Sequence, residues 1–543
     1  MKNFFFIFFK TTLYTFIFLG IFNSSFSKVN EFNFDAKNIS NYFSGIISFD
    51  DLDYNNSQKF LKKLDDFENK SLKYSSRLMQ SFINLEKFKE AYSYSRKLEK
   101  KNLSNFESNL FLGLYEFKRK KYDKAKFYFD KLENNFEHRF IYDILKISLN
   151  TWVTIGQSKD SEAINLIEIE QPAYVNLARI QKAFAYCYKD DPNTGKEFKE
   201  IISNEESNFS RYHFFFANYL NNKNKKDQAT RFIETASEKY PGNLLINQFK
   251  KNINNKMNLK DKFNCGNTSD ILGEILYVFA NAMSSQREYK LSNLYINLSK
   301  FLNPKFKSYD TLLAENYIIL KRNKDAEKIY KKISSLGSIY KWYSAKKISA
   351  IMEEDNIDSI KFLSKTYNEI DPSIYDVYDF ANFLRGKEKY EQSIKLYSKL
   401  LLETNNTHKL YPKILERRGM AYERSDKWNL AEKDLIKSLE LLPKEPYVMN
   451  YLAYSWVEKN KNIELALKML KEANNLKRHD GYITDSLGWA LYKLENFSEA
   501  KKYLEKAIVL MPNDPIVNDH FADCLWKNNN KIQARYYWNN VLD

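Results

Sequence analysis

Cysteine and histidine are the side chains of this 543-residue chain that could bind a metal ion or form a cross-link. The three cysteines, Cys187, Cys265 and Cys524, are widely separated and form no C-x-x-C pair. An odd number at such spacing predicts neither a disulfide framework nor a zinc site. The histidines are scattered without an H-E-x-x-H motif, and each is expected to be buried or to cap a helix: His138, His213, His408, His479 and His520.

Motifs of the common enzyme classes are absent from the sequence. There is no G-x-x-x-x-G-K-[ST], no G-x-G-x-x-G and no G-x-S-x-G. With only 13 glycines in the chain, loops that cradle phosphate groups are not expected. The sequence therefore predicts a protein that is not an enzyme and carries no cofactor.

Composition predicts a folded, mostly helical chain. The hydrophobic content is 43% and the aromatic content 16%, while 10 prolines and few glycines leave little sequence for turns. The net charge of +16 could favour nucleic acid, but basic and acidic residues are interleaved along the chain, as in 118–126 and 461–471. Solvated helix faces explain this pattern better, so no nucleic-acid partner is expected.

The first 27 residues are typical of a signal peptide. Lys10 closes a positive segment, Thr11–Phe22 forms the apolar segment, and Ser25 and Ser27 give a small-x-small cleavage site. The alternative is an uncleaved anchor over Phe4–Phe22, in which Lys10 would cost about 2–3 kcal/mol at membrane depth. We expect cleavage after Ser27 and a periplasmic protein, with attachment to the inner membrane as the alternative. No second apolar run of membrane length follows.

A pattern of small residues recurs about every 34 residues. A small residue is followed by a second one twelve positions later, and often by a proline twelve positions beyond that. Such a period is the mark of stacked helical hairpins. The small residues allow the two helices of a hairpin to cross closely, and the proline ends the second helix. The triplets are Gly488, Ala500, Pro512; Gly419, Ala431, Pro443; Ala217, Ala229, Pro241; and Ala280, Ser292, Pro304.

These residues resemble the signature of the tetratricopeptide repeat (TPR) family. In the unit that begins at Gly481, the signature positions 7, 8, 20, 24, 27 and 32 are occupied by Leu487, Gly488, Ala500, Leu504, Ala507 and Pro512. The resemblance covers nearly all of residues 38–543 and implies an all-α, right-handed superhelix (an α-α solenoid) of roughly 13 repeats. It is strongest over residues 412–543.

Register and composition divide the chain further. We expect a signal peptide at 1–27, a divergent TPR segment at 28–249 and a second array at 271–543. Residues 250–270 are polar, rich in Asn and Lys, and out of register, which predicts a linker between the two arrays, with a loop inside one continuous superhelix as the alternative.

The resemblance also implies where a ligand would bind. In this family the first helix of each repeat lines the concave face, mainly through positions 2, 5, 9, 12 and 13. In the last four repeats these positions include Lys413, Glu416, Met420, Glu423, Tyr447, Val457, Tyr482 and Ile516. The candidate ligand-binding residues combine hydrogen-bond acceptors with aromatic rings: Asn450, Tyr454, Asp485, Trp489, Tyr492, Asp519, Asp523 and Trp526. The structural alternative is that the acceptors cap helices and the rings pack against neighbouring repeats.

Two functions follow from the resemblance. The first is a non-catalytic scaffold that binds a protein or an extended peptide segment along its concave face in the bacterial cell envelope, in association with envelope complexes. The second is a component of envelope polysaccharide export or assembly, for which the aromatic row of Tyr454, Trp489 and Trp526 would bind glycan. The sequence does not identify the partner.

Overall fold

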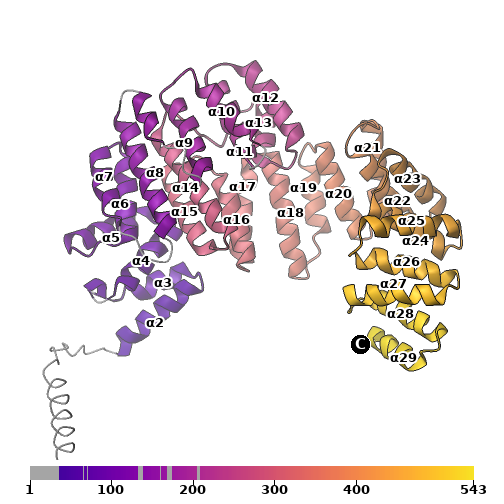
Figure 1. Cartoon of the computed structure of the whole chain (residues 1–543). Helices are drawn as coiled ribbons and strands as arrows, with labels where there is room; N and C mark the ends of the chain where they lie inside the picture. The colour runs from indigo at the N-terminus through magenta and orange to yellow at the C-terminus, as the bar shows by residue number, and fades with distance from the viewer. Residues whose placement is uncertain are drawn as a thin grey trace, which may run out of the picture. The chain divides into compact units, whose positions relative to one another are not determined.

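The computed structural model describes residues 36–64, 67–69, 71–132, 139–158, 161–167, 174–204 and 208–542. Within these ranges the protein contains 28 α-helices and no strand, which confirms the predicted all-α fold (Figure 1). The predicted signal peptide at 1–27 lies outside the described residues. Among the helices that are described, none combines the length and the apolar character that a membrane span requires.

The chain forms two compact units, Met1–Tyr340 (unit 1) and Lys341–Asp543 (unit 2), and the boundary falls in the first turn of α18. Unit 1 contains α2 (Ala36–Asp50), α3 (Tyr54–Leu61), α4 (Leu72–Asn84), α5 (Phe88–Lys100), α6 (Phe106–Lys118), α7 (Tyr122–Asp130), α8 (Arg139–Gln157), α9 (Val175–Tyr188), α10 (Thr194–Ser203), α11 (Ser210–Asn222), α12 (Lys226–Lys239), α13 (Leu244–Asn254), α14 (Thr268–Ser285), α15 (Tyr289–Leu302), α16 (Tyr309–Ile319) and α17 (Asn323–Ile333). Unit 2 contains α18 (Ser338–Glu354), α19 (Ile360–Asn368), α20 (Ile374–Gly386), α21 (Tyr390–Glu403), α22 (Tyr411–Glu423), α23 (Trp428–Leu441), α24 (Pro446–Glu458), α25 (Ile463–Leu476), α26 (Gly481–Lys493), α27 (Phe497–Leu510), α28 (Pro515–Lys527) and α29 (Lys531–Leu542).

Unit 2 is a row of stacked helical hairpins. The pairs α20–α21, α22–α23, α24–α25, α26–α27 and α28–α29 each pack together, and each pair contacts the next. Gly488 lies on α26 at its crossing with α27. A Cβ atom added there would stand 2.6 Å from Cγ and 3.1 Å from the backbone nitrogen of Leu504. The small residue in the repeat therefore makes room for a large side chain on the partner helix.

We predict that Gly488→Ala destabilises unit 2 even though alanine is the better helix former. Crowding against Leu504 should cost about 1–3 kcal/mol, which outweighs a gain of at most about 1 kcal/mol in helix propensity. Gly386, the last residue of α20, is the matched control because nothing lies within 4 Å of an added Cβ atom. Thermal unfolding should show a lower midpoint for Gly488→Ala and an equal or higher one for Gly386→Ala. A rise for both variants would contradict the close crossing.

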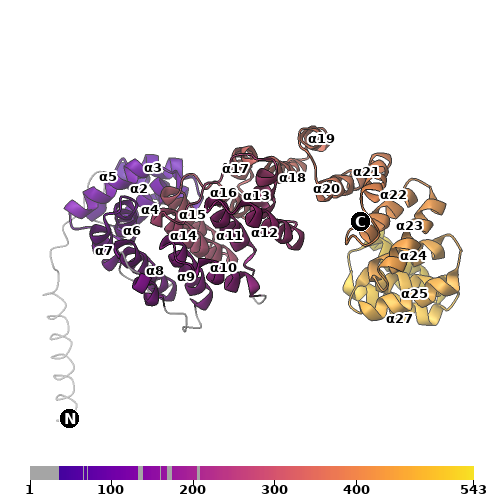
Figure 2. The ribbon, with the colours of Figure 1, turned by 90° about the horizontal axis from the view of Figure 1, so that it is seen from above.

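Unit 1 is a curved row of helices closed around two helices of its own chain. Helices α4, α6, α8 and α9 contact α14 and α15, which we call the inner hairpin (Figure 1, Figure 2). Every residue of α15 from Ser292 to Leu302 is buried, so all sides of this helix are covered. The Nδ2 of Asn297 donates to Oδ1 of Asn84 at 3.1 Å, and Nζ of Lys300 lies 2.6 Å from Oε1 of Glu86. The inner side of this row is therefore already occupied.

A buried ion pair joins the inner hairpin to the surrounding row. Arg211 on α11 donates from Nε to Oε1 of Glu274 on α14 at 2.6 Å, and from Nη2 to Oε2 at 2.9 Å. Glu274 is fully buried, and the guanidinium group lies 4.2 Å from the ring centre of Tyr277. These two hydrogen bonds between charged groups offset the free-energy cost of removing both charges from water.

Residues 250–270, predicted to be a linker, lie inside unit 1. The first of them belong to α13, and Phe263 is buried among aromatic rings, with its ring centre 4.5 Å from that of Phe215. Cys265 forms a disulfide with Cys187 on α9. The expectation of no disulfide was therefore wrong. The two cysteines are 78 residues apart in the sequence, but the fold brings their Cα atoms within 5.8 Å of each other.

Asp270, in the first turn of α14, gives unit 1 a pH dependence. Its carboxylate accepts hydrogen bonds from Asn264 N at 2.9 Å and Asn267 Nδ2 at 2.8 Å, but burial raises its pKa to about 6. Because this pKa is above that of an unfolded aspartate, the folded state binds the proton more tightly, and stability falls as the pH rises from 4 to 6.

We predict that Asp270→Asn stabilises unit 1 at pH 7.5, because it removes this buried charge. The expected gain is about 1–2 kcal/mol after a discount for the partial exposure of the group. At pH 4 the wild-type carboxyl group is protonated, and the gain should vanish. Urea unfolding at both pH values measures the difference, and an equal gain at pH 4 would show that the charge is not its cause.

Candidate functional site

The first helices of four successive hairpins in unit 2 line a groove. Helices α20, α22, α24 and α26 contribute most of its wall, and the cavity volume is about 720 Å³. Tyr447 and Tyr482 are 49% and 60% exposed, so their rings are accessible to a partner. The lining residues are Tyr378, Leu410, Lys413, Glu416, Arg417, Met420, Leu442, Glu445, Tyr447, Asn450, Tyr451 and Tyr482.

Several positions assigned to the concave face from the sequence line this groove. They are Lys413, Glu416, Met420, Tyr447, Asn450 and Tyr482. Of the eight candidate binding residues, Asn450 lies in the groove wall, and its buried Oδ1 has no hydrogen-bond partner among the described residues. A ligand that brings a donor would satisfy this acceptor.

The polar groups of the groove balance in charge. Two basic side chains, Lys413 and Arg417, and two acidic side chains, Glu416 and Glu445, line it. Glu416 is buried, which raises its pKa, and its Oε1 lies 3.5 Å from Nη2 of Arg417. Aromatic walls with balanced charge suit a segment of mixed polarity and offer no cationic track for a polyanion.

Asp485 and Trp489, the central candidates from the sequence, belong to a buried cluster on α26. Asp485 is 5% exposed, and its Oδ2 lies 2.9 Å from Nδ1 of His520 on α28. The Trp489 ring is parallel to His520 within 10° at 3.9 Å and to Tyr492 within 7° at 4.7 Å. Two parallel rings this close would collide on one face, so they cover opposite faces of the indole. Its Nε1 donates to Glu458 Oε1 at 2.6 Å, which leaves Trp489 no free polar group.

The remaining candidates lie on both sides of this cluster. Tyr454 is half-buried, 6.4 Å from His520 between ring centres, and burial raises its pKa to about 12. At the last hairpin, Asp519 is exposed, Trp526 is 36% exposed, and Asp523 accepts from Nε1 of Trp538 at 3.2 Å. Burial and the neighbouring Asp519 raise the pKa of Asp523. Of the eight candidates, Asn450 is therefore the one that lines the groove.

Sequence reasoning missed three groove residues on the helices. Tyr378 holds position 5 of the repeat that precedes the four considered, so the same rule applied one repeat earlier would have selected it. Arg417 and Tyr451 directly follow position 5 of their repeats, a position that the family pattern does not assign to the ligand. In the described part of the chain, no group of three or more His, Cys, Asp or Glu side chains is placed to hold a metal ion.

One stretch of unit 2 matches a known protein family. Residues 485–514 match the tetratricopeptide repeat family. This stretch is a tetratricopeptide repeat. The matched TPR covers α27 and most of α26, the hairpin in which Gly488 meets Leu504.

Similarity to individual proteins covers up to about a third of the chain. The "TPR repeat-containing protein PA4667" of Pseudomonas aeruginosa is 29% identical over 111 residues, which is 20% of this chain and 19% of that relative. Among solved structures, MamA of Desulfovibrio magneticus RS-1 is 17% identical, with 32% of this chain and 96% of that chain covered at a TM-score of 0.28. PilF of Pseudomonas aeruginosa is 20% identical, with 31% and 75% covered at a TM-score of 0.28.

Proposed function

We propose that this protein is a non-catalytic scaffold of the bacterial cell envelope that binds a protein or an extended peptide segment in the unit 2 groove. The observation that carries this proposal is the groove of about 720 Å³, built from successive TPR helices, whose wall holds the unpartnered Asn450 Oδ1. Mixed aromatic and polar lining is what a peptide segment requires. In the described part of unit 1, α14 and α15 occupy the inner side of the row.

Two features support the envelope location. Residues 1–27 have the pattern of a signal peptide, and disulfides such as Cys187–Cys265 persist in oxidising compartments outside the cytoplasm. Fractionation by osmotic shock, with N-terminal sequencing, tests this part. A mature chain that begins at Lys28 in the periplasmic fraction is expected, whereas an intact N-terminus in the cytosol would contradict it.

Site-specific crosslinking in vivo tests the binding site. A photoreactive residue at position 482 lies at the groove, and one at position 402, on α21, is the control because Leu402 is 89% exposed and is not part of the groove wall. We expect one defined protein adduct from position 482, lost when Tyr447 and Tyr378 are both replaced by alanine. Equal capture at both positions, or an adduct unaffected by the replacements, would contradict binding in the groove.

The replacement of Tyr447 by alanine alone should weaken binding of the captured partner about 10-fold. A well-packed interface tyrosine contributes about 1–2 kcal/mol to binding, and 1.4 kcal/mol is tenfold in Kd. Because the Tyr447 ring is half-exposed, the melting temperature of unit 2 should be unchanged. Titration calorimetry with the purified partner measures the change, and unaltered affinity would remove Tyr447 from the interface.

The glycan alternative has less support in the structure. Its central ring, Trp489, is covered on both faces and therefore cannot stack on a sugar. A protein partner captured without polysaccharide would favour the scaffold.

A further inference from the structure

The Cys187–Cys265 disulfide ties the row of helices in unit 1 to the segment that leads into the inner hairpin. Cys187 lies near the end of α9, and Cys265 lies in residues 255–267 between α13 and α14, which we call the crossover segment. Cys187 is 5% exposed and Cys265 is half-buried. The bond closes a loop of 78 residues that contains α10 to α13.

The position of Cys265 depends on the far end of the inner hairpin. Asp261 Oδ1 accepts hydrogen bonds from the backbone nitrogens of Lys307 at 2.7 Å and Ser308 at 3.2 Å, between α15 and α16. The backbone carbonyl of Lys262 accepts from Asn303 Nδ2 at 3.1 Å, and its nitrogen donates to Lys305 O at 3.2 Å. These contacts hold the crossover segment in place, so Cys265 meets Cys187 once the inner hairpin is packed.

A cavity gives reagents access to the bond. It has a volume of about 290 Å³, and both cysteines line it together with Asn218, Asn222 and Lys223. Asn218 Nδ2 donates to the carbonyl oxygen of Phe263 at 2.8 Å and so fixes one wall of this cavity to the crossover segment. A sulfur reagent that enters the cavity can therefore approach the pair.

We propose that Cys187 and Cys265 are a modification site, oxidised by thiol–disulfide exchange with a disulfide oxidant after the inner hairpin has packed. One cysteine thiolate attacks the oxidant's disulfide, forms a mixed disulfide and releases one oxidant thiol. The second thiolate attacks the cysteine sulfur of this mixed disulfide and releases the other oxidant thiol. Two electrons and two protons pass from the cysteine pair to the oxidant, and the new bond holds the crossover segment closed.

This inference is independent of ligand binding in unit 2, and the third cysteine supplies its control. Cys524 is free, fully buried and located on α28. Full-length protein is reduced, freed of reductant and treated with oxidised glutathione, and free thiols are then alkylated in denaturant and counted by mass. We expect three thiols before oxidation and one, Cys524, afterwards. Three thiols after treatment would overturn the proposal.

A second measurement tests what the bond does. Lys256 and Lys262 are exposed in the crossover segment, and trypsin cleavage there reports its opening. We expect cleavage to be at least about tenfold faster in the reduced protein and in Cys187→Ser, because without the disulfide the loop is open and the crossover segment is no longer restricted. The rate in Cys524→Ser should match the wild type. Equal rates in the oxidised and reduced forms would overturn the holding role.

A third variant tests the order of events. Asp261→Ala removes the contacts to Lys307 and Ser308 but leaves both cysteines in place. Reoxidation by glutathione should be several-fold slower in this variant, while the helical circular dichroism of the chain stays near that of the wild type. An unchanged reoxidation rate would show that the pair forms without the packed inner hairpin.

Discussion

Arg211→Ala is expected to lower the free energy of unfolding of unit 1 by about 3–5 kcal/mol, the largest effect we predict for a charged residue. The substitution leaves the carboxylate of Glu274, which is fully buried, without its two hydrogen bonds from the guanidinium group. It also removes the cation that lies 4.2 Å from the ring centre of Tyr277. Hydrogen exchange of peptides from α11 and α14 would locate the loss in unit 1.

Two controls separate this loss from a general effect. In the double variant Arg211→Met, Glu274→Leu no charge is buried, so most of the lost stability should return. Arg231, on the exposed face of α12, should tolerate alanine with a change below about 0.5 kcal/mol. The deficit of Arg211→Ala should also shrink as the pH falls toward 4, because burial raises the pKa of Glu274 and the protonated carboxyl group carries no charge. A deficit independent of pH would contradict this origin.

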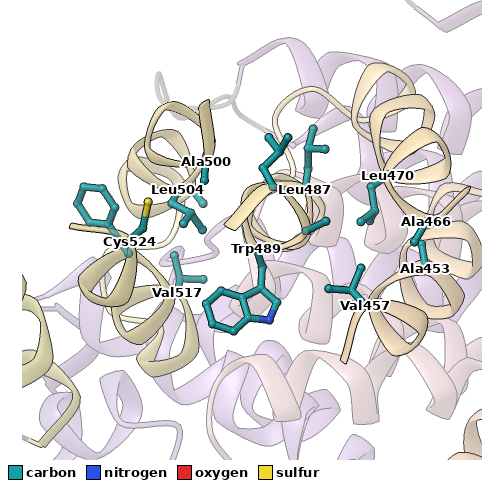
Figure 3. Packing of buried hydrophobic residues seen from close by; sticks show 14 of the residues in the cluster. Ala453, Val457, Ala466, Leu470, Leu487, Trp489, Ala500, Leu504, Val517 and Cys524 are labelled. Atoms are coloured by element: carbon teal, nitrogen blue, oxygen red, sulfur yellow. The ribbon is translucent and has the colours of Figure 1, made fainter. Parts of the chain in front are cut away.

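Trp489→Ala is expected to destabilise unit 2 by a similar amount, about 3–5 kcal/mol. The indole packs between His520 and Tyr492. It belongs to the core that includes Leu487 and Leu504 (Figure 3). Trp489→Phe should lose less stability, because a ring still fills the space while the hydrogen bond to Glu458 is lost. Urea unfolding monitored by circular dichroism measures these differences.

Trp526 provides the comparison for Trp489. It is 36% exposed and its ring centre lies 5.5 Å from that of Trp538, so alanine there should cost about 1 kcal/mol. A ligand-binding role for Trp489 predicts the reverse pattern, with weaker binding and an unchanged unfolding midpoint. That result would indicate that Trp489 contacts the ligand and does not stabilise the core.

The hairpins could be predicted from the sequence because the repeat pattern is local. Gly488 and Leu504 lie on two consecutive helices, and their contact follows from helix geometry and a short turn. The binding surface was harder to predict from the sequence. A repeat position specifies the face of a helix but not the side chains that reach this face from the next repeat. His520 covers both Asp485 and Trp489, although nothing in the sequence near these two residues indicates it.

The contents of unit 1 could not be predicted for a related reason. Asn297 and Lys300 are polar residues that would ordinarily face water, and their partners Asn84 and Glu86 lie more than 200 residues earlier in the chain. Pairing at this separation leaves no periodic signal. The same holds for Cys187 and Cys265, which are distant in sequence and adjacent in the fold.

The inner hairpin of unit 1 follows, along the newly made chain, the helices α4, α6, α8 and α9 that pack around it. Asn84 has no hydrogen-bond partner in the inner hairpin until Asn297, 213 residues later in the chain, is present. During that time the apolar inner side of α4 and α6 has no occupant from its own chain. Partial chains that end before α15 should therefore aggregate or require a chaperone, whereas chains that extend past it should not.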